Sequence, residues 1–373
     1  GRDVYLVPRT RGLLSRTRGS PSGSNPNEEG TNRGMRQYNT FHDAYVENLK
    51  LVYNNPQFYN APRGFRSREV LNNAFVILNP VERVCYLPSR RTNIVFCFAE
   101  VLWYLAGSNS LDFISYYAKS MQKYSADQRT LTGTAYGPKI FRFGPEQINQ
   151  WDRIVNLLTN DDPETKRAVI QIFDPSESLT RDNIDVSCTI GWQFFVRNGK
   201  LYMTTYMRAN DAFRGIVSDV FSFTFVQELL ARQLGLEVGS YCHMVGSAHV
   251  YESDYQWAEK VIAEAEKIQS YMYPFSFPRM PLGDNWRYIH VVLELEQRLR
   301  ENKFKPSVSD LSNLSLPEYW RQVVILFEVY REIVREKAIK REIYQLLIPV
   351  YQYLVANRWS SYVNDVMQYR GRD

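Results

Sequence analysis

The segment Asp185-Val186-Ser187-Cys188-Thr189-Ile190-Gly191-Trp192-Gln193-Phe194 is a strand-like apolar run that carries one cysteine. It is followed by Arg197-Asn198-Gly199-Lys200, and Asn-Gly between two apolar runs is a strong hairpin signal. The second run spans residues 201–208 and ends at Arg208. The turn brings this arginine towards Cys188, and a nearby cation favours the thiolate that makes a cysteine nucleophilic.

Around this hairpin the hydrophobic pattern alternates helices with a few strands. Helices are predicted over residues 39–52, 92–105, 111–124, 148–158 and 217–234, and the chain from residue 252 is largely helical with a Pro-rich break at 274–281. Strands are predicted within residues 70–87, 167–173 and 238–251, and residues 130–143 are predicted to form a loop. This order predicts an α+β fold, with helices packed on an antiparallel or mixed sheet, as one domain over residues 37–373.

Composition favours a globular protein of the reduced cytoplasm. The chain has 373 residues, of which 44% are hydrophobic and 23% are charged. No apolar run approaches the roughly 20 residues that span a bilayer. The four cysteines show neither metal-ligand spacing nor a dense disulfide pattern, so we expect no metal and a cytoplasmic location.

The first 36 residues differ from the rest of the chain. They are rich in Arg, Gly and Ser, and they supply much of the net charge of +5. Such a composition indicates a disordered leader or arm. The alternative is a basic arm that touches nucleic acid.

Two residues stand out as candidates for chemistry. A lone cysteine in a strand is usually a small buried hydrophobe, and Cys85, Cys97 and Cys242 are interpreted in that way. The hairpin partner Arg208 makes Cys188 the exception. Glu100 lies inside an apolar helix, where it is either part of a salt bridge or a buried carboxyl with a raised pKa that acts as a general acid or base.

A third candidate is the pair His249 and Tyr251. Alternate residues of a strand share a face, so both polar tips point to the same side. Such a pair is either a satisfied core network or a ligand-binding pair. Residues 132–137, Thr-Gly-Thr-Ala-Tyr-Gly, taken alone are an ordinary loop.

Taken together and in this order, these segments resemble the thymidylate synthase superfamily. The resemblance covers residues 69–254 and rests on Glu100-Val101-Leu102-Trp103-Tyr104-Leu105-Ala106-Gly107, Ala135-Tyr136-Gly137, Ser187-Cys188 with Gln193-Phe194, Arg208-Ala209-Asn210-Asp211-Ala212-Phe213-Arg214-Gly215, and His249-Val250-Tyr251. No single segment is decisive, but their order and spacing are specific. The segment after Glu252 matches less well.

The resemblance implies a mechanism. Cys188 would add to C6 of a pyrimidine 5′-monophosphate, and C5 would then take the one-carbon unit of 5,10-methylenetetrahydrofolate. Glu100 and Tyr136 match the positions that organise water and proton transfer. Asp211, with Glu100, would contact the folate.

The resemblance also implies the nucleotide site. Arg208 would hold the phosphate and lower the pKa of Cys188, and His249 and Tyr251 would hydrogen-bond the ribose. In the family a second subunit supplies two basic residues to the phosphate, so an obligate homodimer is implied, with the sheet as its interface. The complete set of implied nucleotide-binding residues is Arg63, Lys166, Arg167, Gln193, Arg208, Ala209, Asp219, His249 and Tyr251, in which Lys166 and Arg167 are the pair that reaches the partner.

The sequence departs from the uracil-specific synthases at Asp219, where they carry asparagine. An amide matches the O4 acceptor and N3–H donor of uracil, whereas a carboxylate accepts from the N4 amino group of cytosine. Facing uracil O4, a carboxylate would leave two acceptors opposed, and such mismatches reject a substrate strongly. The alternative is that Asp219 is a solvated acid near a helix N-terminus.

Two further departures concern the base and water. Thr189 replaces the histidine that follows the synthase cysteine and belongs to the water network near uracil O4. No tryptophan lies between Trp103 and Trp151, where the synthases have tryptophans that exclude water from the methylene intermediate. The end of the given sequence, residues 367–373, is polar and basic, unlike the apolar tail that closes over the folate. Access of water favours hydroxymethylation over methylation.

A last departure concerns the ribose. Ala209 replaces a phosphate-binding serine of many relatives, and Lys166 replaces an arginine. The extra room favours CMP over dCMP, as in the CMP/dCMP hydroxymethylase branch of the superfamily, which includes enzymes of nucleoside-antibiotic biosynthesis. The alternatives are thymidylate-type methylation of a uridine nucleotide and a non-catalytic nucleotide- or RNA-binding relative.

Overall fold

The structure, a computed structural model, describes residues 34–179, 183–268 and 273–368. The described residues from Arg36 onward belong to one compact unit. The predictions for residues 1–36 and for the end of the chain therefore lie largely outside the described residues. Within the described ranges, no helix is both long and apolar enough to cross a membrane.

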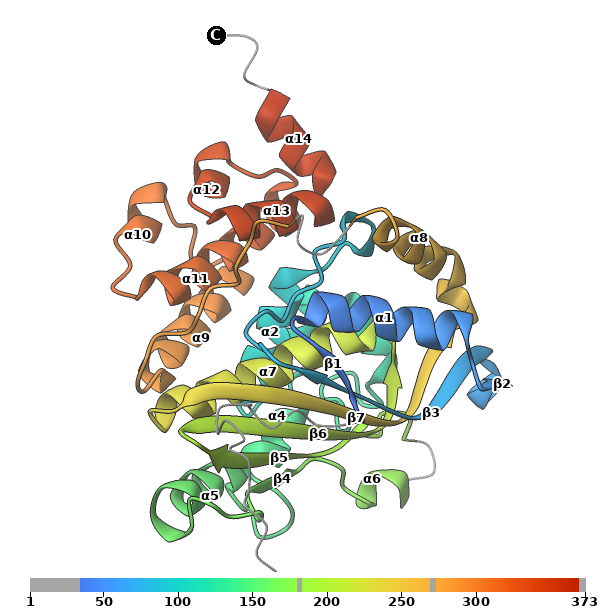
Figure 1. The fold of residues 1–373 in the computed structure, drawn as a ribbon. Helices are drawn as coiled ribbons and strands as arrows, with labels where there is room; N and C mark the ends of the chain where they lie inside the picture. The colour runs from blue at the N-terminus through green and yellow to red at the C-terminus, as the bar shows by residue number, and fades with distance from the viewer. Residues whose placement is uncertain (1–33, 180–182, 269–272, 369–373) are drawn as a thin grey trace, which may run out of the picture. The chain divides into compact units, whose positions relative to one another are not determined.

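A mixed sheet of seven strands organises the described chain (Figure 1). The strands are β1 (Arg36–Tyr38), β2 (Phe58–Asn60), β3 (Ser67–Ile77), β4 (Val169–Gln171), β5 (Thr189–Arg197), β6 (Lys200–Asp211) and β7 (Glu237–Tyr251). Their order is β1-β3-β7-β6-β5-β4, with β2 paired to β3. The β1–β3 and β6–β7 pairs are parallel and the others antiparallel, which confirms the predicted α+β fold.

Helices α1 (Phe41–Asn54) and α7 (Gly215–Gln233) pack on the sheet, and α2 (Ile94–Leu105) packs against α7 (Figure 1). Helix α2 begins where Asn93 accepts a hydrogen bond from the backbone of Phe96, a common N-cap arrangement. It is buried almost all round, as its uniformly apolar sequence requires. The core thus holds Glu100 between α2 and α7.

The remaining helices flank this layer or follow it in the chain. Those before residue 270 are α3 (Leu111–Tyr117), α4 (Tyr136–Phe141), α5 (Gln150–Asn156), α6 (Ser176–Leu179) and α8 (Tyr255–Ala265). Those that follow are α9 (Trp286–Arg300), α10 (Val308–Ser312), α11 (Glu318–Arg331), α12 (Arg341–Gln345), α13 (Pro349–Arg358) and α14 (Ser360–Gln368).

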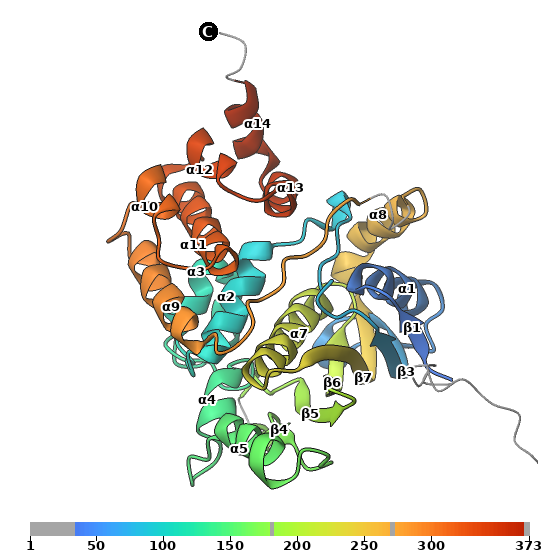
Figure 2. The same ribbon diagram turned by 60° about the vertical axis from the view of Figure 1, so that its left-hand side comes forward.

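The C-terminal helices lie beside α2 and α3, on the side away from the strands (Figure 2). Their aromatic rings reach α2 and α7: Tyr351 lies 6.0 Å from Phe98 and Trp320 lies 6.1 Å from Phe225, measured between ring centroids. This face of α2 and α7 is therefore covered by the chain's own C-terminal segment.

Three predictions of secondary structure need correction. The strand predicted within residues 70–87 ends at Ile77, and residues 78–87 form no strand; Pro80 among them has no N–H for a ladder. The predicted loop 130–143 contains α4, and the predicted helix 111–124 divides into α3 and a 3₁₀ turn at Lys119–Tyr124. The short strands β1 and β2 were not predicted.

Tertiary packing explains the helix inside the predicted loop. The ring of Tyr136 stacks on Tyr104 of α2 with centroids 4.9 Å apart. Gly137 lies so close to α2 that a Cβ there would meet the carbonyl oxygen of Tyr104 at 2.8 Å. Contact with α2 therefore stabilises a helix in a segment whose composition alone favours a loop.

The sheet bends along one line that crosses three strands. In β3, β6 and β7 two successive residues are left unburied, at Leu71–Asn72, Arg208–Ala209 and Gly246–Ser247, and these positions are neighbours in the ladder. The adjacent pairing of β5 with β6 shifts register between Thr189 and Gly191. Such interruptions bend and twist strands. A Cβ on Gly246 would meet the carbonyl oxygen of Arg208 at 2.9 Å, so the close approach requires glycine there.

Candidate active site

Cys188 and Arg208 meet at this bend, as the hairpin predicted. The backbone N–H of Arg208 donates to the carbonyl of Cys188 at 2.8 Å, and Nη2 of Arg208 lies 3.7 Å from the Cys188 sulfur. Cys188 is open to solvent on one side. Protein packed around the rest of the thiol raises its pKa, although the charge of Arg208 opposes this rise. Arg208 thus acts on the Cys188 pKa in the predicted direction, but the effect of burial is larger and the pKa is raised overall.

Backbone carbonyls orient the Arg208 side chain. Its Nε donates to the carbonyl of Ser187 at 2.8 Å and its Nη2 to that of Val186 at 2.9 Å. No protein acceptor for Nη1 is found among the described residues. The guanidinium is exposed, and it keeps one terminal amino group for a ligand such as a phosphate.

A buried polar cluster holds the residue before the nucleophile. The Ser187 N–H donates to Glu177 Oε2 at 2.8 Å, and its hydroxyl donates to the carbonyl of Gly133 at 2.8 Å. The ammonium of Lys139 donates to both Glu177 and Ser187. Burial lowers the pKa of Lys139 to about 8. The sequence analysis did not find this cluster, because its three members come from separate segments.

Glu100 is a buried carboxyl and not a salt-bridge partner. Its Oε2 accepts a hydrogen bond from the hydroxyl of Ser222 at 3.2 Å. Burial raises its pKa to about 7, and hydrogen bonds from Ser218, Ser222 and Tyr104 limit the rise. Of the two alternatives left open by the sequence, the structure favours the carboxyl that exchanges a proton near neutral pH.

Tyr136 stands next to the nucleophile strand. Its hydroxyl and that of Thr189 share a hydrogen bond of 2.9 Å, and both side chains are buried. Thr189 follows Cys188 directly, so Tyr136 is fixed one residue away from the sulfur. The residue that the sequence identified as a departure from the synthases is therefore a partner of a predicted catalytic residue.

Asp219 lies on the first turns of α7 and is half-buried. Its Oδ2 accepts a hydrogen bond from Nδ2 of Asn210 at 2.7 Å. Burial raises its pKa well above the usual range, and the nearby carboxyl of Glu100 raises it further. A solvated acid at a helix N-terminus would show neither effect.

The predicted ribose and folate residues gather at the same end of the sheet. Asp211 pairs with His249 in the ladder, and the His249 ring lies 4.8 Å from the ring of Tyr251. Asp211 Oδ1 accepts from the backbone N–H groups of Phe213 and Arg214, both at 2.9 Å. Within the described chain, Oδ2 of Asp211 has no donor and can receive one from a ligand.

Arg63 also reaches this end of the sheet. It is exposed in the short turn Pro62–Gly64. Its positive charge lowers the pKa of Cys188 and that of Tyr251, against the rise that burial causes in each. The structure therefore brings Arg63 near the predicted phosphate site.

Lys166 and Arg167 lie apart from Cys188, just before the edge strand β4. Both are exposed, and Arg167 lines a cavity of about 420 Å³ together with residues of α5. Gln193 donates to the carbonyl of Lys166 at 2.8 Å and accepts from the Tyr206 hydroxyl at 2.9 Å, so its amide is engaged within the protein. Ala209 lies on the bend. The roles predicted for these residues stay predictions.

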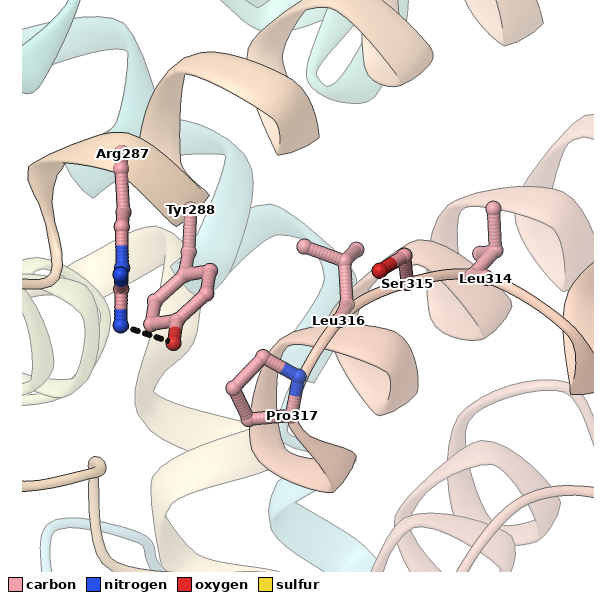
Figure 3. A pocket seen from close by; sticks show the side chains of 6 residues that line it. All are labelled: Arg287, Tyr288, Leu314, Ser315, Leu316 and Pro317. Carbon is pink, nitrogen blue, oxygen red and sulfur yellow. Dashed lines mark hydrogen bonds between the residues drawn. The ribbon is translucent and has the colours of Figure 1, made fainter.

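A separate surface pocket of about 400 Å³ lies at α9 and the loop before α11 (Figure 3). Arg287 donates to the Tyr288 hydroxyl at 2.6 Å on one side, and Leu314–Pro317 form the other. None of the predicted site residues lines it. It is not part of the candidate active site.

Comparison with known proteins identifies the family. The pattern of the thymidylate synthase family matches residues 43–283. A deoxyuridylate hydroxymethyltransferase of Bacillus phage SP01 is 32% identical over 217 residues, which cover 56% of this chain and 56% of that protein. One of Pseudomonas phage M6 is 31% identical over 180 residues, 48% of this chain and 50% of that protein. The chain thus spans about half the length of these relatives. On the family match, it belongs to the thymidylate synthase family.

Proposed function

We propose that this chain transfers a one-carbon unit to C5 of a cytidine 5′-monophosphate, with CMP favoured over dCMP, and that water converts this unit to a hydroxymethyl group. The observation that carries the proposal is the contact of the Cys188 sulfur with Arg208 at 3.7 Å, in a site that also holds Glu100 and Tyr136. The relatives named deoxyuridylate hydroxymethyltransferases support hydroxymethylation of a nucleotide.

The residues can carry the steps in sequence. The Cys188 thiolate donates an electron pair to C6, and the pair of the C5–C6 double bond then makes C5 nucleophilic. Methylenetetrahydrofolate supplies the carbon at the oxidation level of formaldehyde. C5 attacks that carbon, its bond to the folate nitrogen breaks and tetrahydrofolate leaves, while Glu100 takes the C5 proton through water. Water then adds to the exocyclic methylene, and the electron pair of the ring expels the Cys188 thiolate from C6, which restores the C5–C6 double bond. Hydroxymethylation therefore needs no hydride, and the folate product is tetrahydrofolate.

Asp219 supports cytosine as the base. Its carboxylate can accept from the N4 amino group, and a shared proton can satisfy N3, which becomes more basic once C6 is attacked. The second candidate for the substrate is a uridine nucleotide, which is favoured by the two relatives because both are named deoxyuridylate hydroxymethyltransferases. The exposed 3₁₀ turn at Lys119–Tyr124, which has no tryptophan, supports the access of water in either case.

One assay tests the function. The protein is incubated with methylenetetrahydrofolate and, separately, CMP, dCMP, UMP or dUMP, and both the modified nucleotide and the folate product are identified. We expect 5-hydroxymethyl-CMP and tetrahydrofolate, because no hydride leaves the folate. Growth of dihydrofolate absorbance would indicate methylation, and turnover of UMP or dUMP in preference to cytidine nucleotides would contradict the choice of base.

Asp219→Asn tests the base directly. An amide can donate to O4 of uracil, whereas the carboxylate accepts from N4 of cytosine, so the variant should shift kcat/KM from cytidine towards uridine nucleotides by about 10-fold or more. The measurement is the ratio of kcat/KM for CMP and UMP. An unchanged ratio would remove the basis for cytosine.

We propose that the chain forms a homodimer with two active sites. In each site, Lys166 and Arg167 of one subunit would contact the phosphate of the nucleotide bound to the other subunit. Their exposure supports this, and Gln193, which donates to the carbonyl of Lys166, lies well beyond Cys188 along β5. Mixing inactive Cys188→Ala with inactive Arg167→Ala, after dissociation and reassociation, should restore about one quarter of the activity, because some mixed dimers then hold one intact site. The same mixture kept without exchange is the control. A failure to restore activity after verified exchange argues against a shared site.

Protonation of Glu100 should appear in stability. A carboxyl whose pKa rises to about 7 on folding binds its proton more tightly in the folded state, so the stability it contributes is lost as pH rises from about 4.5 through about 7. Relative to Glu100→Gln, the wild type should lose on the order of 2–3 kcal/mol between about pH 5 and about pH 8.5. Urea unfolding at both pH values measures this. Glu47→Gln, on the surface of α1, is the control, and an equal difference at both pH values would contradict the assignment.

A further inference from the structure

Four polar side chains form a continuous chain of hydrogen bonds that ends in the active site. The Tyr241 hydroxyl lies 2.8 Å from Nδ1 of His243, and Nε2 of His243 lies 3.0 Å from Oδ1 of Asn210. Nδ2 of Asn210 then donates to Oδ2 of Asp219 at 2.7 Å. The first three side chains are buried, and only Asp219 is partly open to the site.

The bend in the sheet makes this chain possible. In the ladder His243 pairs with Thr205 and Asn210 pairs with Ala248, so the two residues are well separated along their strands. The bend lies between these positions, where the pairing of β6 with β7 is interrupted, and a strand that bends there can bring Asn210 within the 3.0 Å of His243 that the structure shows. The polar residues therefore face α7 on the covered side of the sheet.

The chemistry of the groups fixes the direction of each hydrogen bond. The carbonyl oxygen of Asn210 can only accept, so Nε2 of His243 carries a proton. Burial lowers the pKa of His243 to about 3, so the ring is neutral and Nδ1 has no proton. The Tyr241 hydroxyl must then donate to Nδ1. With its carbonyl turned to His243, Asn210 presents its amino group to Asp219.

This direction restricts what Asp219 can offer a ligand. A carboxyl that is free to turn can carry its proton on either oxygen, so it presents a donor and an acceptor to the base in either order. Such a carboxyl can hydrogen-bond to cytosine or to uracil. Asn210 holds Oδ2 as an acceptor, so any proton resides on Oδ1. Asp219 can therefore present its donor and acceptor oxygens to the base in one order and not in the other.

We propose that Tyr241, His243 and Asn210 are positioning residues that fix Oδ2 of Asp219 as an acceptor and so determine which pyrimidine the site prefers. The inference rests on the proposed function, because Asp219 must face the base. It differs from that proposal in assigning the selectivity to a hydrogen-bond chain and not to Asp219 alone.

A merely structural role predicts a different result. If the chain only satisfies buried polar groups, its loss weakens folding or lowers activity on all nucleotides by the same factor. If it orients Asp219, its loss changes the ratio between two bases that differ only at N3 and C4. The ratio is therefore the diagnostic quantity.

The experiment compares His243→Phe with His243→Gln. Phenylalanine fills the space beside Phe75 but has no donor for Asn210, whereas the glutamine amide can replace the Nε2–H. Binding of CMP and of UMP to each folded protein is measured calorimetrically without folate, and kcat/KM is measured with it. We expect the CMP-to-UMP ratio to fall by about 10-fold in His243→Phe and by less than about 3-fold in His243→Gln. Equal losses for both nucleotides in His243→Phe would overturn the inference.

Tyr241→Phe provides a second test that keeps the His243 ring in place. Without the hydroxyl donor the ring can move its proton to Nδ1, Asn210 can turn, and the ratio should again fall. An unchanged ratio in folded Tyr241→Phe and His243→Phe would overturn the inference. If the wild type instead prefers UMP, the cytidine proposal fails, whereas a collapse of that preference in both variants would still support the positioning role.

Discussion

The bend across β3, β7 and β6 is the constraint on which the site depends. In a regular strand alternate side chains point to opposite faces, so Arg208 and Asn210, two residues apart, would lie on the same face. Two successive unburied positions reverse this order at Arg208–Ala209. Arg208 can then face Cys188, while Asn210, two residues later, turns to the covered side. A single irregularity thereby places Arg208 on the exposed side and Asn210 on the buried side of the same strand.

Two carboxyls give the covered side its electrostatic character. Glu100 and Asp219 both lose hydration next to α7, and the charge of Glu100 raises the pKa of Asp219. The hydroxyl of Ser222 donates to Glu100 and the amide of Asn210 donates to Asp219, and neither donor carries a charge that would neutralise a carboxylate. Cations near both carboxyls would lower their pKa values and remove the capacity to hold protons at neutral pH. The arginines are instead at the open end, where anionic substrate groups would lie.

Local signals accounted for the parts of the protein that depend on local sequence. Asn198-Gly199 predicted the hairpin, and hence the contact of Arg208 with Cys188. The isolated acid in an apolar helix singled out Glu100 and left a salt bridge and a buried carboxyl as alternatives, of which the structure shows the buried carboxyl. The α+β class and the family were also predicted correctly.

The remainder depends on contacts between distant segments. Helix α4 forms because Tyr136 stacks on Tyr104, and no periodicity within residues 130–143 signals it. Asn210 was visible beside Arg208, but its partner His243 is determined by the bend, and the bend is recognised only from the burial pattern of three paired strands. The signal in the sequence was a pair of polar residues, Tyr241 and His243, at alternate positions of β7, and His249 and Tyr251 give the same signal further along this strand.

The C-terminal helices have a consequence for how the protein can be divided. The segment that matches the family ends at residue 283, yet Phe98 and Phe225 within it are covered by Tyr351 and Trp320 from beyond that limit. Expressed alone, that segment would present the apolar surface of α2 to water, and a contiguous apolar patch promotes aggregation. The segment that matches the family therefore lacks part of the packing around its own core, and the C-terminal helices complete that packing around the helix that carries Glu100.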